Sequence, residues 1–302
     1  MAHGARFYPL ARGRVTRWAQ STLVRPVGTV LAIVTLIAGC GGHQKPKPPP
    51  PPAPAPGLGD FVGIYSDDVF FGDDAYKSAT LARERQAGIG LIRQPFAWSD
   101  FERDPQPFDA FVGAAARDGI RVLPVVLGPE PGAAKATGGM APPRDVSAYA
   151  AYAAALENRY GPAGSFWRSH TDVPKLPIRS WQIWNEPNIP AFWASGPDPA
   201  AYAKLLEAAG RAVREIDPQA EIVTAGLPTS HLGVPAAKFL QGIYDAGASG
   251  AFDEVAVHAY AHTPAGVLNR ASEAKQVIDR NGDNARLWIT EFGWGTGGKP
   301  GR

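Results

Sequence analysis

The sequence predicts an α/β fold built around a parallel β-sheet. From residue 60 onward, short apolar runs alternate with helical patterns, as expected for repeated strand and helix units. The runs around 181–186 and 286–291 are rich in Trp and Ile, as is typical of strands buried on both faces of a parallel sheet. A hydrophobic content of 45% over 302 residues is enough for one large core.

The predicted strands are short apolar runs that end at glycine, proline or polar residues. There are seven, at 61–65, 90–94, 121–127, 181–186, 221–225, 254–260 and 286–290. The predicted helices have apolar residues at helical spacing, and they lie at 74–87, 108–118, 146–160, 199–216, 235–246 and 264–280. The fourth is the best specified, because Asp198 is a suitable N-cap, Pro199 suits the first turn and Pro218 follows its end. Residues 128–144 form a long loop rich in Gly and Pro at a strand end, where such loops are usually functional.

Two glutamates stand at the ends of predicted strands. Pro187 cannot donate a hydrogen bond to a strand ladder, so the fourth strand must stop before it and Glu186 lies at the carboxyl end. Glu291 ends the seventh strand in the same way. Ligands bind at this end of parallel α/β architectures. A solvated loop glutamate is the alternative for either residue taken alone.

The two motifs around these glutamates resemble those of a known enzyme clan. The stretch W-N-E-P-N at 184–188 resembles the acid/base signature of the clan A glycoside hydrolases, and T-E-F-G-W at 290–294 resembles their nucleophile strand. The resemblance covers about residues 60–294. It is closest to the xylosidase-like and exopolysaccharide-cleaving members of family 39, with the cellulase-like family 5 enzymes as neighbours. It implies that Glu186 is the acid/base, that Glu291 is the nucleophile and that Asn185 holds the sugar 2-hydroxyl.

The resemblance also implies a TIM-type (β/α)8 barrel for residues 57–302. Eight strands close such a barrel, whereas only seven are visible in this sequence. We therefore expect the chain to be truncated at its C-terminus, lacking an evident eighth strand. The alternative is that the last strand comes from elsewhere.

Further substrate-binding residues are expected from the same resemblance. Arg93 would pair with the nucleophile, with a structural salt bridge as the alternative. Tyr260 would donate a hydrogen bond to the nucleophile, and His258 would contact substrate unless it is a core histidine. Aromatic faces in the predicted strand-end loops could stack on sugar rings or simply pack, and the candidates are Trp98, Trp193 and Trp294.

No cofactor is expected from the sequence. The two carboxylates suffice for retaining hydrolysis, in which one attacks the anomeric carbon and the other protonates the leaving oxygen. His258 and His262 are four residues apart, but no carboxylates stand at ligand spacing, so no metal site is predicted.

The first 56 residues hold seven Lys or Arg and no Asp or Glu, which leaves the remaining chain acidic. An acidic domain argues against nucleic-acid binding.

The N-terminus has the features of a bacterial lipoprotein signal. Residues 1–39 are basic and then apolar, and the apolar run is shorter than a membrane-spanning helix. The stretch I-A-G-C resembles a lipobox, which would place a lipid on Cys40; a plain signal peptide with an incidental Cys is the alternative. Residues 40–56 form a proline-rich linker, which favours an extended spacer. We expect an extracytoplasmic protein, lipid-anchored to the cell membrane.

These inferences predict a retaining β-glycoside hydrolase that acts on extracellular polysaccharide or oligosaccharide. The alternative is a catalytically inactive, surface-anchored protein that binds carbohydrate through an incomplete barrel.

Overall fold

The computed structural model describes residues 62–132, 139–229 and 231–294. The predicted signal peptide, Cys40 and the proline-rich linker lie outside the described residues. Among the described helices, none has both the length and the apolar character needed to cross a membrane.

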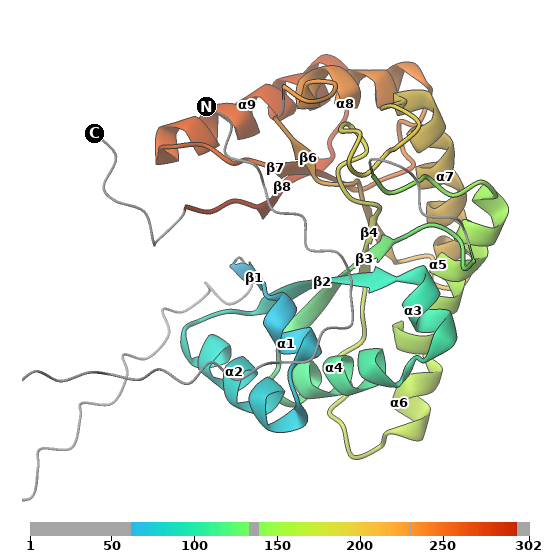
Figure 1. Ribbon diagram of the computed structural model, residues 1–302, viewed down its shortest axis with the longest axis vertical. Helices are drawn as coiled ribbons and strands as arrows, with labels where there is room; N and C mark the ends of the chain where they lie inside the picture. Colours follow the sequence, from blue (N-terminus) through green and yellow to red (C-terminus); the bar gives the residue numbers. More distant parts are fainter. Residues whose placement is uncertain (1–61, 133–138, 230, 295–302) are drawn as a thin grey trace, which may run out of the picture. The chain divides into compact units, whose positions relative to one another are not determined.

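The described chain folds into a parallel sheet that is nearly closed into a barrel, with helices around the outside (Figure 1). All strand pairs are parallel, and they connect β1 to β2, β2 to β3, β3 to β4, β4 to β5, β5 and β6 to β7, and β7 to β8. The strands are β1 (Gly63–Tyr65), β2 (Leu91–Ala97), β3 (Arg121–Leu127), β4 (Ser180–Ile183), β5 (Glu221–Val223), β6 (Leu227–Pro228), β7 (Glu254–His258) and β8 (Arg286–Glu291).

The eight strands occupy seven positions in the sheet. Val223 of β5 and Leu227 of β6 both pair with β7, so β6 continues the line of β5 after a short break at 224–226. Within the described ranges, no ladder joins β1 to β8. The predicted barrel type and its seven strand positions are therefore confirmed.

The helices follow the strands in the order expected for βα units. They are α1 (Asp67–Phe71), α2 (Asp74–Gln86), α3 (Trp98–Arg103), α4 (Gln106–Arg117), α5 (Val146–Tyr160), α6 (Ser165–Ser169), α7 (Pro199–Arg214), α8 (Ala236–Asp245) and α9 (Pro264–Arg280). The predicted cap of α7 is confirmed, because the Asp198 side chain accepts hydrogen bonds from the backbone of Ala200 and Ala201.

The sequence did not predict α1, α3 and α6. Each has five or six residues, which is too short to show a helical period. The prediction also ended β2 too early, since the strand continues through Pro95 to Ala97.

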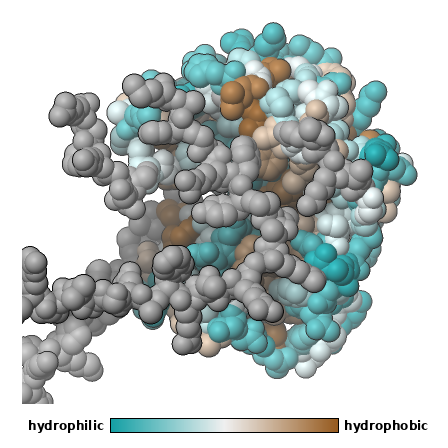
Figure 2. Space-filling model, viewed as in Figure 1, coloured by the Kyte–Doolittle hydropathy of each residue, from teal (hydrophilic) through white to brown (hydrophobic). Residues whose placement is uncertain are grey.

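Apolar residues pack on both sides of the strands. The larger core lies between the strands and the helices and includes Phe96, Trp181 and Leu206. A smaller cluster contains one residue from each of three strands, Leu123 from β3, Val223 from β5 and Ala256 from β7, and lies in the barrel interior. On the side seen in Figure 2, much of the described surface is hydrophilic, with apolar patches between. The barrel therefore provides a rigid frame whose strand ends position the site.

Candidate active site

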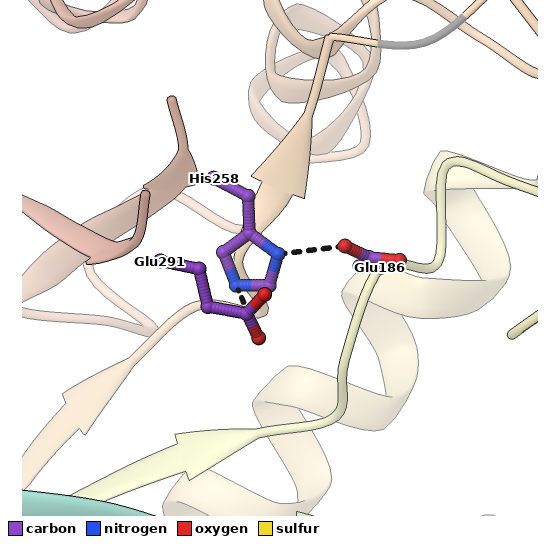
Figure 3. A group of neighbouring side chains, drawn as sticks. All are labelled: Glu186, His258 and Glu291. Atoms are coloured by element: carbon purple, nitrogen blue, oxygen red, sulfur yellow. Dashed lines mark hydrogen bonds and ion pairs between the residues drawn. The ribbon is translucent and has the colours of Figure 1, made fainter. Parts of the chain in front are cut away.

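The site is built where the carboxyl ends of β4, β7 and β8 meet. Glu186 follows β4, His258 ends β7 and Glu291 ends β8. Figure 3 shows the imidazole between the two carboxylates. In the sequence, 105 residues separate the two glutamates; the barrel brings them together.

The backbone after β4 turns sharply to present Glu186. Trp184 and Glu186 both have a positive φ, of 70° and 44°, which is uncommon for residues other than glycine. The backbone N–H of Glu186 donates to the carbonyl of Gly226 at 3.2 Å, which fixes the turn. Adjacent residues of a regular strand face opposite ways, and this turn instead lets Asn185 and Glu186 reach one site. Such backbone strain costs about 1–3 kcal/mol per residue and is concentrated at functional sites.

The separation of the carboxylates fits one of the two stereochemical mechanisms. An oxygen of Glu186 and an oxygen of Glu291 lie within 4.8 Å of each other. Retaining glycosidases hold their carboxyl groups roughly 5–5.5 Å apart, whereas inverting enzymes need about 6.5–9.5 Å to admit a water molecule. The geometry therefore suits direct attack by one carboxylate.

Arg93 joins the two motifs through three hydrogen bonds. Its guanidinium donates to Glu291 Oε1 at 2.6 Å, to Gln182 Oε1 at 2.6 Å and to Asn185 Oδ1 at 2.9 Å. The Arg93 side chain is 5% exposed, so this charge acts with little screening by water. The predicted pairing of Arg93 with the nucleophile candidate is confirmed in the geometry. The guanidinium therefore places a positive charge directly beside the Glu291 carboxyl group.

Tyr260 supplies a second contact to the same carboxylate. Its hydroxyl donates to Glu291 Oε2 at 2.9 Å, as predicted. Burial, followed by the negative charge of Glu291, raises the pKa of Tyr260 above its usual range, so the hydroxyl keeps its proton and remains a donor. Both oxygens of Glu291 are thus hydrogen-bonded, which fixes the direction of the carboxylate.

Glu186 has the opposite electrostatic environment. Burial raises its pKa to about 7, and the more distant charge of Arg93 offsets only part of this effect. A carboxyl group with such a pKa keeps its proton to near neutral pH and can act as a general acid. A proton-carrying Glu186 beside a Glu291 that is bound by Arg93 is the arrangement that acid and nucleophile roles require.

The structure places His258 differently from the prediction. Its side chain is fully buried, with Nδ1 at 2.7 Å from Glu186 Oε1 and Nε2 at 3.4 Å from Glu291 Oε1. Burial lowers the pKa of His258 to about 3, so the ring is neutral. The expected substrate contact is wrong for this conformation, because the ring lies between the carboxylates with no surface open to a ligand.

The three side chains also form a group of possible metal ligands. Donor atoms of Glu186, His258 and Glu291 lie within 4.8 Å of one another. Arg93, however, holds a fixed positive charge 2.6 Å from Glu291 Oε1, and a cation at that oxygen would be repelled. We therefore assign these groups to acid/base chemistry.

Comparison with known proteins agrees with the fold. No family model and no curated protein matches the sequence. Among solved structures, a monomeric β-xylosidase from Caulobacter crescentus CB15 superposes with a TM-score of 0.57 at 18% identity, over 76% of this chain and 51% of that one. A family GH39 β-xylosidase from Caulobacter crescentus gives 0.57 at 19% identity, over 77% and 53%.

A glucosidase from Croceicoccus marinus is also similar, with a TM-score of 0.54 at 18% identity, over 70% of this chain and 46% of that one. The chain spans about half the length of these solved structures. At such identities the likeness is one of fold. The chain thus shares the fold of family 39 glycoside hydrolases, as its motifs predicted.

For two of the three tryptophans the structure shows the packing alternative and not a face open to a sugar. Trp98 is 4% exposed, stacks on Tyr152 and donates its indole N–H to Glu102; Trp193 is 3% exposed and packs against Trp184. Both lie in short helical or turn segments that fold back onto the core. Trp294, by contrast, is 48% exposed and can offer a face to a ligand.

Sequence reasoning missed three residues that shape the site. Gln182 accepts from Arg93 and is fully buried; a polar residue within an apolar strand was the available signal. Gly226 packs directly against the His258 ring, where a Cβ would come within 1.9 Å of Nε2. Tyr65, at the end of β1, lies with its ring 5.6 Å from the Arg93 guanidinium. Nothing in the sequence marked the last two.

Proposed function

We propose that this chain is a retaining β-glycoside hydrolase that acts on extracellular polysaccharide or oligosaccharide. The observation that carries the proposal is the carboxylate pair: an oxygen of each lies within 4.8 Å of the other, Glu186 is largely buried with a pKa of about 7, and Glu291 is bound by Arg93. This combination of spacing and charge fits double displacement.

In the first step, Glu291 attacks the anomeric carbon and forms a glycosyl ester. The bond from that carbon to the leaving oxygen breaks, and the proton of Glu186 passes to this oxygen. In the second step, Glu186 takes a proton from water while the water oxygen attacks the anomeric carbon. The ester bond breaks, Glu291 regains its charge and the product keeps the β configuration.

The neighbouring residues have separate roles in this scheme. Arg93 and Tyr260 hold Glu291 in line for attack and stabilise its charge as it returns. Asn185 uses its oxygen to accept from Arg93, which leaves its amide N–H groups for the sugar 2-hydroxyl. Trp294, which is about half exposed and three residues after Glu291, would stack on a sugar ring.

The sugar is proposed from the structural likeness. The similar solved structures are β-xylosidases and a glucosidase, so β-xylosides and β-glucosides are the first substrates to test.

The test is hydrolysis of activated aryl β-glycosides by the full chain. Glu291→Ala should lose turnover, and added azide should restore part of it by attacking the anomeric carbon in place of the carboxylate, giving the α-glycosyl azide. Glu273→Ala, an exposed glutamate on α9, is the control and should retain full activity. Undiminished turnover by Glu291→Ala would overturn the assignment. Saturable oligosaccharide binding by the unmutated chain without release of reducing ends would instead indicate a carbohydrate-binding protein.

We also propose that the protein is tethered outside the cytoplasm by a lipid on Cys40. The lipobox-like sequence supports this proposal. Expressed in a bacterium with lipoprotein processing, the native chain should partition into detergent and the Cys40→Ala variant into the aqueous phase. Equal partitioning of the two would contradict the anchor.

A further inference from the structure

His258 contacts both carboxylates of the proposed mechanism, through different nitrogens. Nδ1 lies 2.7 Å from Glu186 Oε1, a short hydrogen bond, while Nε2 lies 3.4 Å from Glu291 Oε1 and has no hydrogen-bond partner among the described residues (Figure 3). A buried polar nitrogen without a partner is uncommon and calls for a reason.

The position of the ring is fixed by close packing. The side chain of His258 is fully buried, and Gly226 leaves no room for a Cβ beside Nε2. The backbone N–H of Glu186 donates to the carbonyl of the same glycine. The imidazole therefore cannot turn away from either carboxylate without disturbing the turn that holds Glu186.

A neutral imidazole carries one N–H and one acceptor nitrogen. If the proton is on Nε2, it points toward ionised Glu291, and Nδ1 must accept a hydrogen bond, which only protonated Glu186 can donate. If the proton is on Nδ1, it donates to ionised Glu186, and the lone pair of Nε2 faces Glu291. The tautomer of His258 and the charge of Glu186 are thus linked by geometry.

We infer that His258 couples the charge states of the two carboxylates: its single proton lies on Nε2, toward Glu291, while Glu186 is protonated, and on Nδ1 once Glu186 is ionised. The groups facing the ring are Glu186 from the β4 loop, Glu291 from β8, Arg93 from β2 and Tyr260 beyond β7. When both carboxylates are ionised, Arg93 already balances Glu291, so the shorter contact to Glu186 takes the proton.

In the catalytic cycle, which rests on the proposed function, this positioning residue would serve both steps. In the free protein, Nε2–H faces the charged Glu291. After the glycosyl ester forms, Glu291 is uncharged and Glu186 has given up its proton. One proton then leaves Nε2 and one arrives at Nδ1, both exchanged with water through the partly exposed carboxyl groups on either side, so the ring stays neutral and donates a hydrogen bond to ionised Glu186.

The test is the tautomer of His258, read by ¹⁵N NMR of the full chain labelled at histidine. Signals of the six histidines are told apart by the loss of one set in His258→Asn. The nitrogen without a proton should be Nδ1 at pH values where Glu186 is protonated, and Nε2 at higher pH values where Glu186 is ionised. A single tautomer across the whole pH range would overturn the inference.

Glu186→Gln is the matched variant, because its amide does not titrate and can donate to Nδ1 in place of a protonated Glu186. It should keep the proton on Nε2 at every pH, and a persisting switch would show that another group drives it. A 2-deoxy-2-fluoroglycosyl adduct should move the proton to Nδ1 at a pH where the free protein has it on Nε2. Failure to form any adduct would count against the glycosidase proposal, whereas an adduct with an unchanged tautomer would count against the coupling alone.

Discussion

Arg93 links three other side chains of the site. It binds Glu291, Asn185 and Gln182 at once, and its side chain is nearly buried. A guanidinium suits this task because its donors lie in one rigid plane, whereas an ammonium group acts as a point charge. The residue therefore fixes the direction of the Glu291 carboxylate and places a positive charge beside it.

Replacing Arg93 by Met should lower kcat/KM on the order of 100-fold, because a misplaced nucleophile alone costs that much. Arg93→Lys should recover only part of the loss, since one ammonium cannot bind three partners. Steady-state kinetics on the best aryl glycoside measures both variants. Equal activity of the lysine variant and the unmutated chain would show that only the charge matters.

The raised pKa of Glu186 predicts the pH dependence of activity. The acid form is needed for the first step, and the pKa is about 7, so kcat/KM should fall about tenfold per pH unit above that value. A dinitrophenyl glycoside has a leaving group that needs no proton, so its kcat/KM should fall less steeply at alkaline pH. An equally steep fall of kcat/KM for the dinitrophenyl glycoside and for a glycoside with a poorer leaving group would indicate that a group other than Glu186 is titrating.

At the level of elements, the β4 loop depends on Asn188. Its amide donates to the carbonyls of Pro228 and Val234, both at 2.9 Å, and so ties the loop that carries Glu186 to β6 and to the segment before α8. The side chain is fully buried, and these two carbonyls would lose their donors if it were shortened.

Asn188→Ala should therefore destabilise the fold by about 1–3 kcal/mol for the unsatisfied groups, and should lower kcat through a displaced Glu186. Asn188→Asp retains the shape but loses the donors, so it should resemble the alanine variant. Urea unfolding and kcat are the two measurements. An aspartate variant as stable and active as the native chain would contradict the role of the amide.

The sequence predicted the bounds of several elements to the residue. The strand Arg121–Leu127 and the helices Val146–Tyr160 and Pro264–Arg280 have the predicted bounds. Arg93, Asn185, Glu186, Glu291 and Tyr260 meet because strand-end residues of a barrel converge. The burial of His258 and Trp98 could not be predicted, because it depends on how the loops fold back.

At the scale of the whole molecule, three carboxyl groups with raised pKa values make the stability of the fold depend on pH. Burial raises the pKa values of Glu157, Glu186 and Glu254 to about 7, from 4.5. Because the folded state holds these protons more tightly than the unfolded state, each group stabilises the fold. This contribution is complete below about pH 4.5 and is lost as the pH rises through about 7. His258, with a lowered pKa of about 3, acts in the opposite direction on acidification.

Glu157 offers the cleanest test, because it is remote from the chemistry. It accepts from the Trp181 indole at 2.6 Å, and a glutamine oxygen can do the same. Glu157→Gln should raise the stability at pH 8 by about 1–3 kcal/mol and flatten the pH dependence. Denaturant unfolding at several pH values measures the free energy of unfolding, and Glu273→Gln, at an exposed position, is the control. A glutamine variant with the native pH slope would contradict the assignment.

The most direct measurement is peptide mapping of the full chain after reaction with activated 2-deoxy-2-fluoro-β-glycosides. The second step is slowed in such sugars, so the glycosyl ester should accumulate on Glu291, increase the mass of the peptide that carries it and be absent from Glu291→Ala. An adduct on Glu186 or on any other residue, or turnover of aryl glycosides with inversion and no adduct, would contradict the retaining mechanism.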